Sequence, residues 1–374
     1  MKISYIVNAR IPTERAHGIQ ITKMAESFAD LGFKTELILP RRRNPITEDV
    51  FKYYGLKENF EIKFLPCWDL ITLDKYIGHL GLWIESMTFL ISATFYIIFN
   101  QADIIYTRDV SLLPLTLFKK NVFLESHSMP RKYFLYAPFL RRLKGIIAIT
   151  AILKKIFLEK GIKENKLFVA PDGVDLDEFD IKQTQAECRK RLNLPQEEKI
   201  IVYTGHLYKW KGVQILADSA EYLPENAGIY FIGGTKEDIK EFKSKNSVSN
   251  IKIVGHQSHT EIPYWLKAAD ILVLPNSAKE DISLYWTSPL KLFEYMAANR
   301  PIIASDLPSI REILNEDNSL LVPPDDVQKL GQALNRLLAD QALSMRISNN
   351  AYREAKKYTW QKRARGIIEF ILKQ

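Results

Sequence analysis

The residue types at the start of one predicted helix are those that bind an anion. Ser288 and Pro289 suit the N-cap and the first helical position, and apolar residues follow at spacings of one, three and four. Lys291 and Glu294 therefore fall one turn apart near the N-terminus of this helix. Because a helix N-terminus presents open N–H groups and a partial positive charge, the pattern predicts an anion site. The alternative is an ordinary amphipathic helix with a solvated Lys–Glu pair.

A second lysine has a similar setting. Residues 199–204 predict a buried strand, and Lys211-Gly212 ends the loop before a helix expected at 213–222. A lysine at a helix N-terminus binds phosphate well, because its charge adds to that of the helix dipole. The alternative for Lys211 is simple solvation at the surface.

Two positions in the first half of the chain also suit a ligand site. The strand expected at 121–126 places Glu125 and His127 at its carboxyl end, where open α/β sheets bind ligands. A lone histidine is more often structural, but this placement favours function. Gly18 ends a polar loop expected from residue 10, where a glycine would let a backbone approach a substrate closely. It is equally well read as a simple loop glycine.

Residues 286–306 resemble the donor-binding signature of the family-4 retaining glycosyltransferases, which have the GT-B fold. In that family a Glu, seven intervening residues and a second Glu open the helix, and a Pro-Ile/Val-Ile-Ala strand follows. Glu294 matches the second Glu, and residues 301–304 match the strand. Trp286 stands at the position of the first Glu, so half of the motif is absent. Residues 171–175 and 358–360 resemble the segments that close the family's first domain and open its last helix.

The resemblance implies roles for individual residues toward a nucleotide-diphosphate sugar. Lys211 and Lys291 would hold the diphosphate together with the helix N-terminus, and His206 replaces an arginine that the family uses there. Glu294 would accept hydrogen bonds from the ribose, and His127 would orient the transferred sugar. The donor-binding residues implied are Gly18, Gly205, His206, Lys211, His256, Ser288, Leu290, Lys291 and Glu294, and the catalytic residues are His127, Lys211 and Glu294.

Alternating strands and helices predict an α/β protein, and the resemblance implies a GT-B arrangement of two Rossmann-like doubly wound domains facing across a cleft. We expect an acceptor domain over 1–178, a donor domain over 179–359, and a C-terminal helix at 360–374 that crosses back to the first domain. There is no Gly-x-Gly-x-x-Gly after the first strand, so a dinucleotide fingerprint is absent.

Composition and charge limit the kinds of partner that this protein can have. The net charge of +8 is uneven, because residues 1–166 hold 25 Lys and Arg against 16 Asp and Glu, or +9, and the remainder holds 27 against 28, or −1. This excess suits an anionic membrane or an acidic acceptor, and no basic groove or finger motif supports nucleic acid. The basic and aromatic run 131–144 would suit lipid headgroups or be a solvated face. The apolar stretch 80–99 is read as a helix packed inside the first domain, rather than a membrane span.

We therefore expect a metal-independent hexosyltransferase that moves a sugar from a nucleotide-diphosphate sugar to a glycan, lipid-linked or small-molecule acceptor, in polysaccharide or glycolipid synthesis. No cofactor is expected. His256 and His259 are spaced for a metal, but no carboxylate or cysteine completes a site in the sequence. Two distant cysteines and the lack of a signal peptide favour the cytoplasm, with a peripheral membrane location as an option. The alternatives are a GT-B epimerase or phosphorylase, and a non-catalytic sugar-binding subunit.

Overall fold

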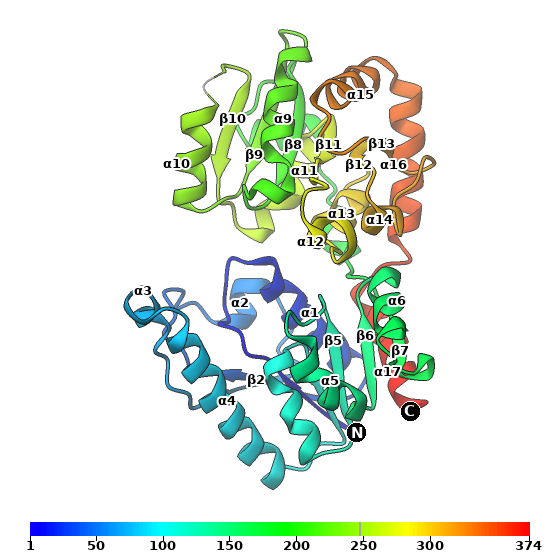
Figure 1. Cartoon of the computed structure of the whole chain (residues 1–374). Helices are drawn as coiled ribbons and strands as arrows, with labels where there is room; N and C mark the ends of the chain where they lie inside the picture. Colours follow the sequence, from blue (N-terminus) through cyan, green and yellow to red (C-terminus); the bar gives the residue numbers. More distant parts are fainter. Residues whose placement is uncertain (247) are drawn as a thin grey trace. The chain divides into compact units, whose positions relative to one another are not determined.

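The computed structural model describes residues 1–246 and 248–374, which divide into two compact domains (Figure 1). The first domain comprises Met1–Pro171 and Trp360–Gln374, and the second comprises Asp172–Thr359. The domain boundary thus lies at Pro171, earlier than the predicted residue 178. The C-terminal segment belongs to the first domain although it follows the second in the chain.

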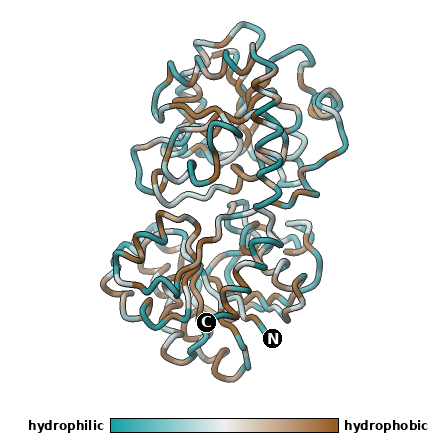
Figure 2. Tube along the Cα trace, turned by 90° about the vertical axis from the view of Figure 1, so that its right-hand side faces the viewer, coloured by the Kyte–Doolittle hydropathy of each residue, from teal (hydrophilic) through white to brown (hydrophobic). Residues whose placement is uncertain are grey.

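The first domain is built on seven parallel strands in the order β3-β2-β1-β4-β5-β6-β7. The central strands are buried almost throughout, as in parallel sheets covered by helices, whereas the strand at one edge, Glu61–Leu65, has no buried residue. Hydrophobic runs lie inside each domain (Figure 2). The strands are β1 (Lys2–Ile6), β2 (Lys34–Pro40), β3 (Glu61–Leu65), β4 (Ile104–Thr107), β5 (Val122–Ser126), β6 (Gly145–Ala148) and β7 (Leu167–Val169). The α-helices are α1 (Ala16–Asp30), α2 (Val50–Tyr54), α3 (Asp74–Ile77), α4 (Leu80–Phe99), α5 (Tyr133–Arg142), α6 (Ala151–Glu159) and α17 (Trp360–Leu372), with 3-10 turns η1 (Ile71–Leu73), η2 (Val110–Leu117) and η3 (Glu164–Lys166).

Six parallel strands form the second sheet, in the order β10-β9-β8-β11-β12-β13. Strand order reverses between β8 and β11, so the loops after these strands flank the point where open α/β sheets bind ligands. The strands are β8 (Lys199–Thr204), β9 (Ala227–Ile232), β10 (Ile251–Gly255), β11 (Ile271–Leu274), β12 (Ile302–Ser305) and β13 (Leu320–Val322). The α-helices are α7 (Leu176–Phe179), α8 (Gln185–Arg191), α9 (Val213–Asp218), α10 (Lys236–Lys245), α11 (Ile262–Ala268), α12 (Asp281–Tyr285), α13 (Leu290–Ala297), α14 (Pro308–Arg311), α15 (Val327–Ala339) and α16 (Gln341–Ala355), with 3-10 turns η4 (Lys209–Lys211), η5 (Ser219–Tyr222) and η6 (His259–Glu261).

Several local expectations differ from the structure. The polar region 41–75 contains α2 and β3, and three helices, α15, α16 and α17, finish the chain. Helix α13 begins at Leu290 and Pro289 is its N-cap residue, without a capping side chain. Ser288 does not cap the helix, because its Oγ accepts a hydrogen bond from the N–H of Asp172 instead (2.9 Å).

The apolar helix α4 lies on the surface of the first domain, and the expectation that it packs inside was wrong. A stripe at four-residue spacing is buried against the domain, and most of the remaining side chains are exposed or half-exposed. By length and composition α4 would also suffice to cross a membrane.

A buried ion pair ties the C-terminal helix to the first sheet. Glu125, at the end of β5, is fully buried, and its Oε2 lies 2.9 Å from the Arg363 Nη1 of α17. The Tyr106 hydroxyl and the Gln20 amide also donate to this carboxylate. Arg363 donates further to the carbonyls of Ala170 and Pro171, the last residues before the second domain. One side chain therefore links α17, β5 and the end of the first domain.

Replacing Arg363 with Met should destabilise the first domain by about 3–5 kcal/mol, because Glu125 would stay buried without its cation. Native-state hydrogen exchange of β4 and β5 would measure the loss. Arg365→Met is the matched control, since Arg365 is exposed on the same helix. Equal protection in the two variants would mean that the Arg363 pair contributes nothing to stability.

Candidate functional site

Two lysines of the second domain converge at the carboxyl end of β8. A Cβ placed on Gly205 would lie 3.6 Å from the Lys211 Nζ and 3.9 Å from the Lys291 Nζ. Lys211 comes from the loop after β8, and Lys291 comes from the first turn of α13. The structure therefore brings together the two cations that the sequence places eighty residues apart.

Buried contacts hold Lys291 in this position. All eight residues of α13 are buried, so the predicted alternative of a solvated Lys–Glu pair is excluded. The Tyr295 hydroxyl accepts a hydrogen bond from the N–H of Thr204 (2.8 Å), which fastens α13 to the end of β8. The Lys291 ammonium donates to the Thr204 carbonyl (3.1 Å) and lies 3.7 Å from the centre of the Tyr203 ring. A carbonyl and an aromatic face thus hold the cation.

The loop that carries Lys211 depends on two glycines. Gly205 has a φ of +117° and Gly212 a φ of +68°, both in the region that favours glycine. At Gly212 a Cβ would also lie 1.8 Å from the carbonyl oxygen of Pro275, the residue after β11. The Tyr203 hydroxyl donates to the His206 carbonyl (2.7 Å), which closes the loop onto its own strand. Lys211 is therefore presented by a rigid turn.

The electrostatics of the two lysines favour an anion. Burial lowers the pKa of Lys211 to about 8, and burial together with the neighbouring Lys211 lowers the pKa of Lys291 well below its usual value. Among the described residues, no carboxylate forms an ion pair with either ammonium group. Two cations that are desolvated side by side are costly, and an anion between them would remove that cost. The geometry suits a diphosphate, which carries several negative oxygens.

Glu294 lies one turn further along α13, in contact with a histidine. Its Oε1 lies 3.3 Å from the His259 Nε2, and the His259 Nδ1 lies 2.7 Å from Glu178 of α7. Burial disfavours the charged imidazole ring, but the two carboxylates outweigh it and raise the pKa of His259 to about 10. His259 is therefore an imidazolium at neutral pH that orients the Glu294 carboxylate.

For the other predicted donor-binding residues of the second domain, the structure shows contacts other than those with the two lysines. His206 stacks on Tyr208, and its Nδ1 lies 3.5 Å from Asp238, so the imidazole is turned toward a carboxylate. His256 is exposed just after β10. Leu290 is buried at the start of α13, and Ser288 holds the backbone of Asp172 as described above.

In the first domain His127 is held by the Glu125 network. Its Nε2 lies 2.7 Å from the Glu125 Oε1. Burial and the positive charge of Arg108 lower the pKa of His127 to about 4, although Glu125 acts in the opposite direction. Arg363 holds the pKa of Glu125 well below its usual value despite burial. A neutral His127 therefore donates Nε2–H to the carboxylate and leaves its Nδ1 lone pair as an acceptor for a hydroxyl.

Gly18 has a packing role in the structure. It lies in the first turn of α1, not in the expected loop, and a Cβ there would lie 2.1 Å from the Tyr54 hydroxyl oxygen. That hydroxyl bonds to both the N–H and the carbonyl of Thr13. The missing side chain makes room for Tyr54, which secures the loop after β1.

Reasoning from the sequence missed two residues of these sites. His259 was considered only as a metal ligand, and its contact with Glu294 depends on how η6 and α13 pack. His17, whose pKa burial and Arg108 lower to about 4, interacts electrostatically with His127 in the first domain. The signal for His17 was its place beside Gly18, since a polar residue in the loop after a first strand is a candidate for ligand contact.

Part of this chain is similar in sequence to known proteins. Residues 198–340 match the family model described as glycosyl transferases group 1. The putative teichuronic acid biosynthesis glycosyltransferase of Bacillus subtilis is 26% identical over 185 residues, which are 49% of this chain and 44% of that protein. The chain spans about half the length of the curated relatives it matches. The similarity to group 1 glycosyl transferases thus lies in the second domain.

Solved structures agree over the whole chain. Sucrose-phosphate synthase from Thermosynechococcus elongatus has a TM-score of 0.81 at 18% identity, covering 100% of this chain and 99% of its own. HepE of Anabaena, solved in complex with UDP and glucose, has a TM-score of 0.78 at 15% identity and covers 100% of both chains. The predicted fold class, two Rossmann-like α/β domains of the GT-B type, is confirmed.

The affinity for a nucleoside diphosphate should fall as the pH rises above about 8, the pKa of Lys211 in the free protein. A bound diphosphate favours the ammonium form, so binding above that pH must take up a proton, and Lys291 acts in the same direction. Calorimetry in buffers of different ionisation enthalpy would measure this uptake. Affinity that is unchanged from pH 7 to 9.5, without proton uptake, would contradict the assignment.

Proposed function

We propose that this chain is a retaining glycosyltransferase that uses a nucleotide-diphosphate sugar as donor. The observation that carries the proposal is the pair of desolvated ammonium groups at the switch point of the second sheet. The group 1 match covers the same residues, and the likeness to HepE, which was solved with UDP and glucose, adds support.

The proposed chemistry uses the cations in the transition state. As the bond between the sugar and the diphosphate breaks, negative charge develops on the leaving oxygens, and Lys211 and Lys291 stabilise it. These fixed charges would take the place of a divalent cation. Among residues 1–246 and 248–374, no group of three or more His, Cys, Asp or Glu residues is arranged to hold a metal ion. The leaving phosphate would deprotonate the acceptor hydroxyl on the same face of the sugar, which gives retention.

Glu294 is proposed to bind the ribose of the donor. Its carboxylate is held by the His259 imidazolium and lies one turn from Lys291 on α13. A carboxylate can accept hydrogen bonds from both ribose hydroxyls. His127 would accept a hydrogen bond from a sugar hydroxyl through its Nδ1.

The acceptor is proposed to be a glycan or a lipid-linked sugar of the cell surface, and the location the cytoplasm or the cytoplasmic membrane face. Support comes from the Bacillus subtilis relative, whose name places it in teichuronic acid biosynthesis. A small-molecule acceptor is the second candidate.

The competing proposal is a non-catalytic sugar-binding subunit, favoured by Trp286 in place of the family's first Glu and by His206 in place of its Arg. Slow release of free nucleotide from the donor without acceptor would favour the enzyme, and no release from any bound donor would favour the subunit. A GT-B epimerase would release the epimeric sugar.

Lys211→Ala should weaken donor binding by about 1.5–3 kcal/mol, the range for hydrogen bonds to charged groups. Lys209→Ala is the matched control, because Lys209 lies in the same turn but is exposed. Isothermal titration with the donor that gives the largest thermal shift would compare the two variants. Equal affinities would place Lys211 outside the donor site.

Lys291→Ala separates two roles for this cation. If Lys291 binds the diphosphate, the substitution should weaken the free nucleoside diphosphate and the donor alike. If it selects an acidic sugar, only donor affinity should fall, and Trp286 would then face the sugar. We expect the first outcome, since Lys291 and Lys211 share one position beside Gly205.

Glu294→Gln is the companion test, and it should weaken both ligands because the proposed ribose contact is common to both. If both affinities stay unchanged, the assignment of α13 to the donor is wrong.

A further inference from the structure

Helix α4 presents an apolar stripe to solvent along its whole length. Trp83, Met87, Ile91, Phe95 and Phe99 follow one another at four-residue spacing, and all are exposed. Glu85 is the only charged residue in the helix. A surface helix of a soluble domain normally carries charged residues on its outer face, and an apolar outer face marks an interaction site.

The opposite side of α4 is fastened to the first domain. Gly81, Glu85, Phe89, Ala93 and Ile97 form the buried stripe, also at four-residue spacing. The two stripes run along opposite sides of the helix, so burial of one leaves the other outward.

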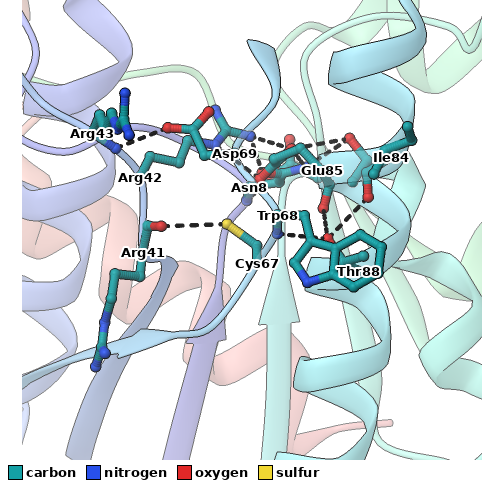
Figure 3. A network of polar contacts seen from close by, with 12 residues as sticks. Asn8, Arg41, Arg42, Arg43, Cys67, Trp68, Asp69, Ile84, Glu85 and Thr88 are labelled. Atoms are coloured by element: carbon teal, nitrogen blue, oxygen red, sulfur yellow. Dashed lines mark hydrogen bonds and ion pairs between the residues drawn. The ribbon is translucent and has the colours of Figure 1, made fainter. Parts of the chain in front are cut away.

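Polar contacts reinforce this attachment (Figure 3). The Glu85 carboxylate is fully buried and forms two contacts with the Arg42 guanidinium, of 2.5 and 2.8 Å. The Thr88 hydroxyl accepts from the N–H of Trp68, and Ser92 donates to the carbonyl of Pro66. Moving α4 away from the domain would break the buried ion pair between Arg42 and Glu85, and breaking such a pair costs free energy. This attachment favours a helix that lies on a surface over one that spans a membrane.

Residues beside the stripe suit lipid headgroups. Trp68 and Tyr76 are exposed on segments adjoining α4, and such aromatic side chains favour the membrane interface. Arg41, Arg43 and Lys75, in the segments packed beside it, are exposed cations. In a two-fold dimer this patch would meet itself and bring like charges together, whereas anionic lipids complement them.

We propose that α4 docks the first domain on an anionic membrane, lying in the plane of the interface with the stripe Trp83–Phe99 in the lipid. The Arg42–Glu85 pair keeps the helix attached to the domain. The inference does not depend on the proposed transfer activity.

Sedimentation of the full chain with vesicles tests the proposal. The wild type should bind vesicles of phosphatidylcholine with phosphatidylglycerol more tightly than phosphatidylcholine alone, and binding should weaken as salt rises. The double variant Ile91→Glu/Phe95→Glu removes two apolar side chains that are 51% and 59% exposed. It should bind about tenfold or more weakly. Met345→Glu, at a residue of α16 that is 54% exposed, is the matched control and should bind like the wild type.

The folded state is checked by circular dichroism, which should be unchanged because both substituted side chains point outward. Failure of the wild type to bind anionic vesicles at low salt would overturn the proposal, and so would equal binding by the double variant. A wild-type dimer in light scattering that the double variant abolishes, without vesicle binding, would identify a second copy as the occupant instead. Resistance to alkaline carbonate extraction would show that α4 spans the membrane.

Discussion

The repulsion between the Lys211 and Lys291 ammonium groups is the interaction on which the second domain's site depends. Two like charges in a partly desolvated setting repel by an amount on the order of a few kcal/mol. The fold maintains this arrangement through the Gly212 turn against Pro275 and through the Tyr295 hydroxyl on β8. The lowered pKa values show how the free protein relieves the strain, by giving up protons that a bound anion would restore.

The first domain treats its buried charge in the opposite way. Glu125 is paired with Arg363 and receives hydrogen bonds from Tyr106, Gln20 and His127, so its charge is balanced within the fold. The balanced network determines the orientation and protonation of the His127 ring, and it anchors α17 to the first sheet. In the second domain the two ammonium charges are not balanced within the fold, so they can attract an anion. The contrast between the two buried clusters is the physical basis for assigning the anion to the second domain.

The sequence predicts features that depend on local pattern, and these include the parallel strands and the position of Lys211 and Lys291 at strand and helix ends. The sequence does not predict which residue, far away in the chain, forms a hydrogen bond or ion pair with a given polar side chain. Ser288 suits an N-cap, but the Asp172 N–H, far away in the chain, occupies its oxygen. His259 becomes an imidazolium only because α7 and α13 bring Glu178 and Glu294 to its two nitrogens. Such contacts depend on packing, which spacing does not encode.

Helix α4 shows a second limit to prediction from the sequence pattern. A helix that is apolar on every side has no preferred face, so its sequence does not say whether it is covered or exposed. In the structure the carboxylate of Glu85 determines which face of α4 is buried. Glu85 can be buried only where Arg42 reaches it, and this requirement fixes the rotation of the helix and turns Trp83, Ile91 and Phe95 outward. A buried ion pair adds little net stability, but here it selects a single orientation among apolar alternatives that are nearly equal.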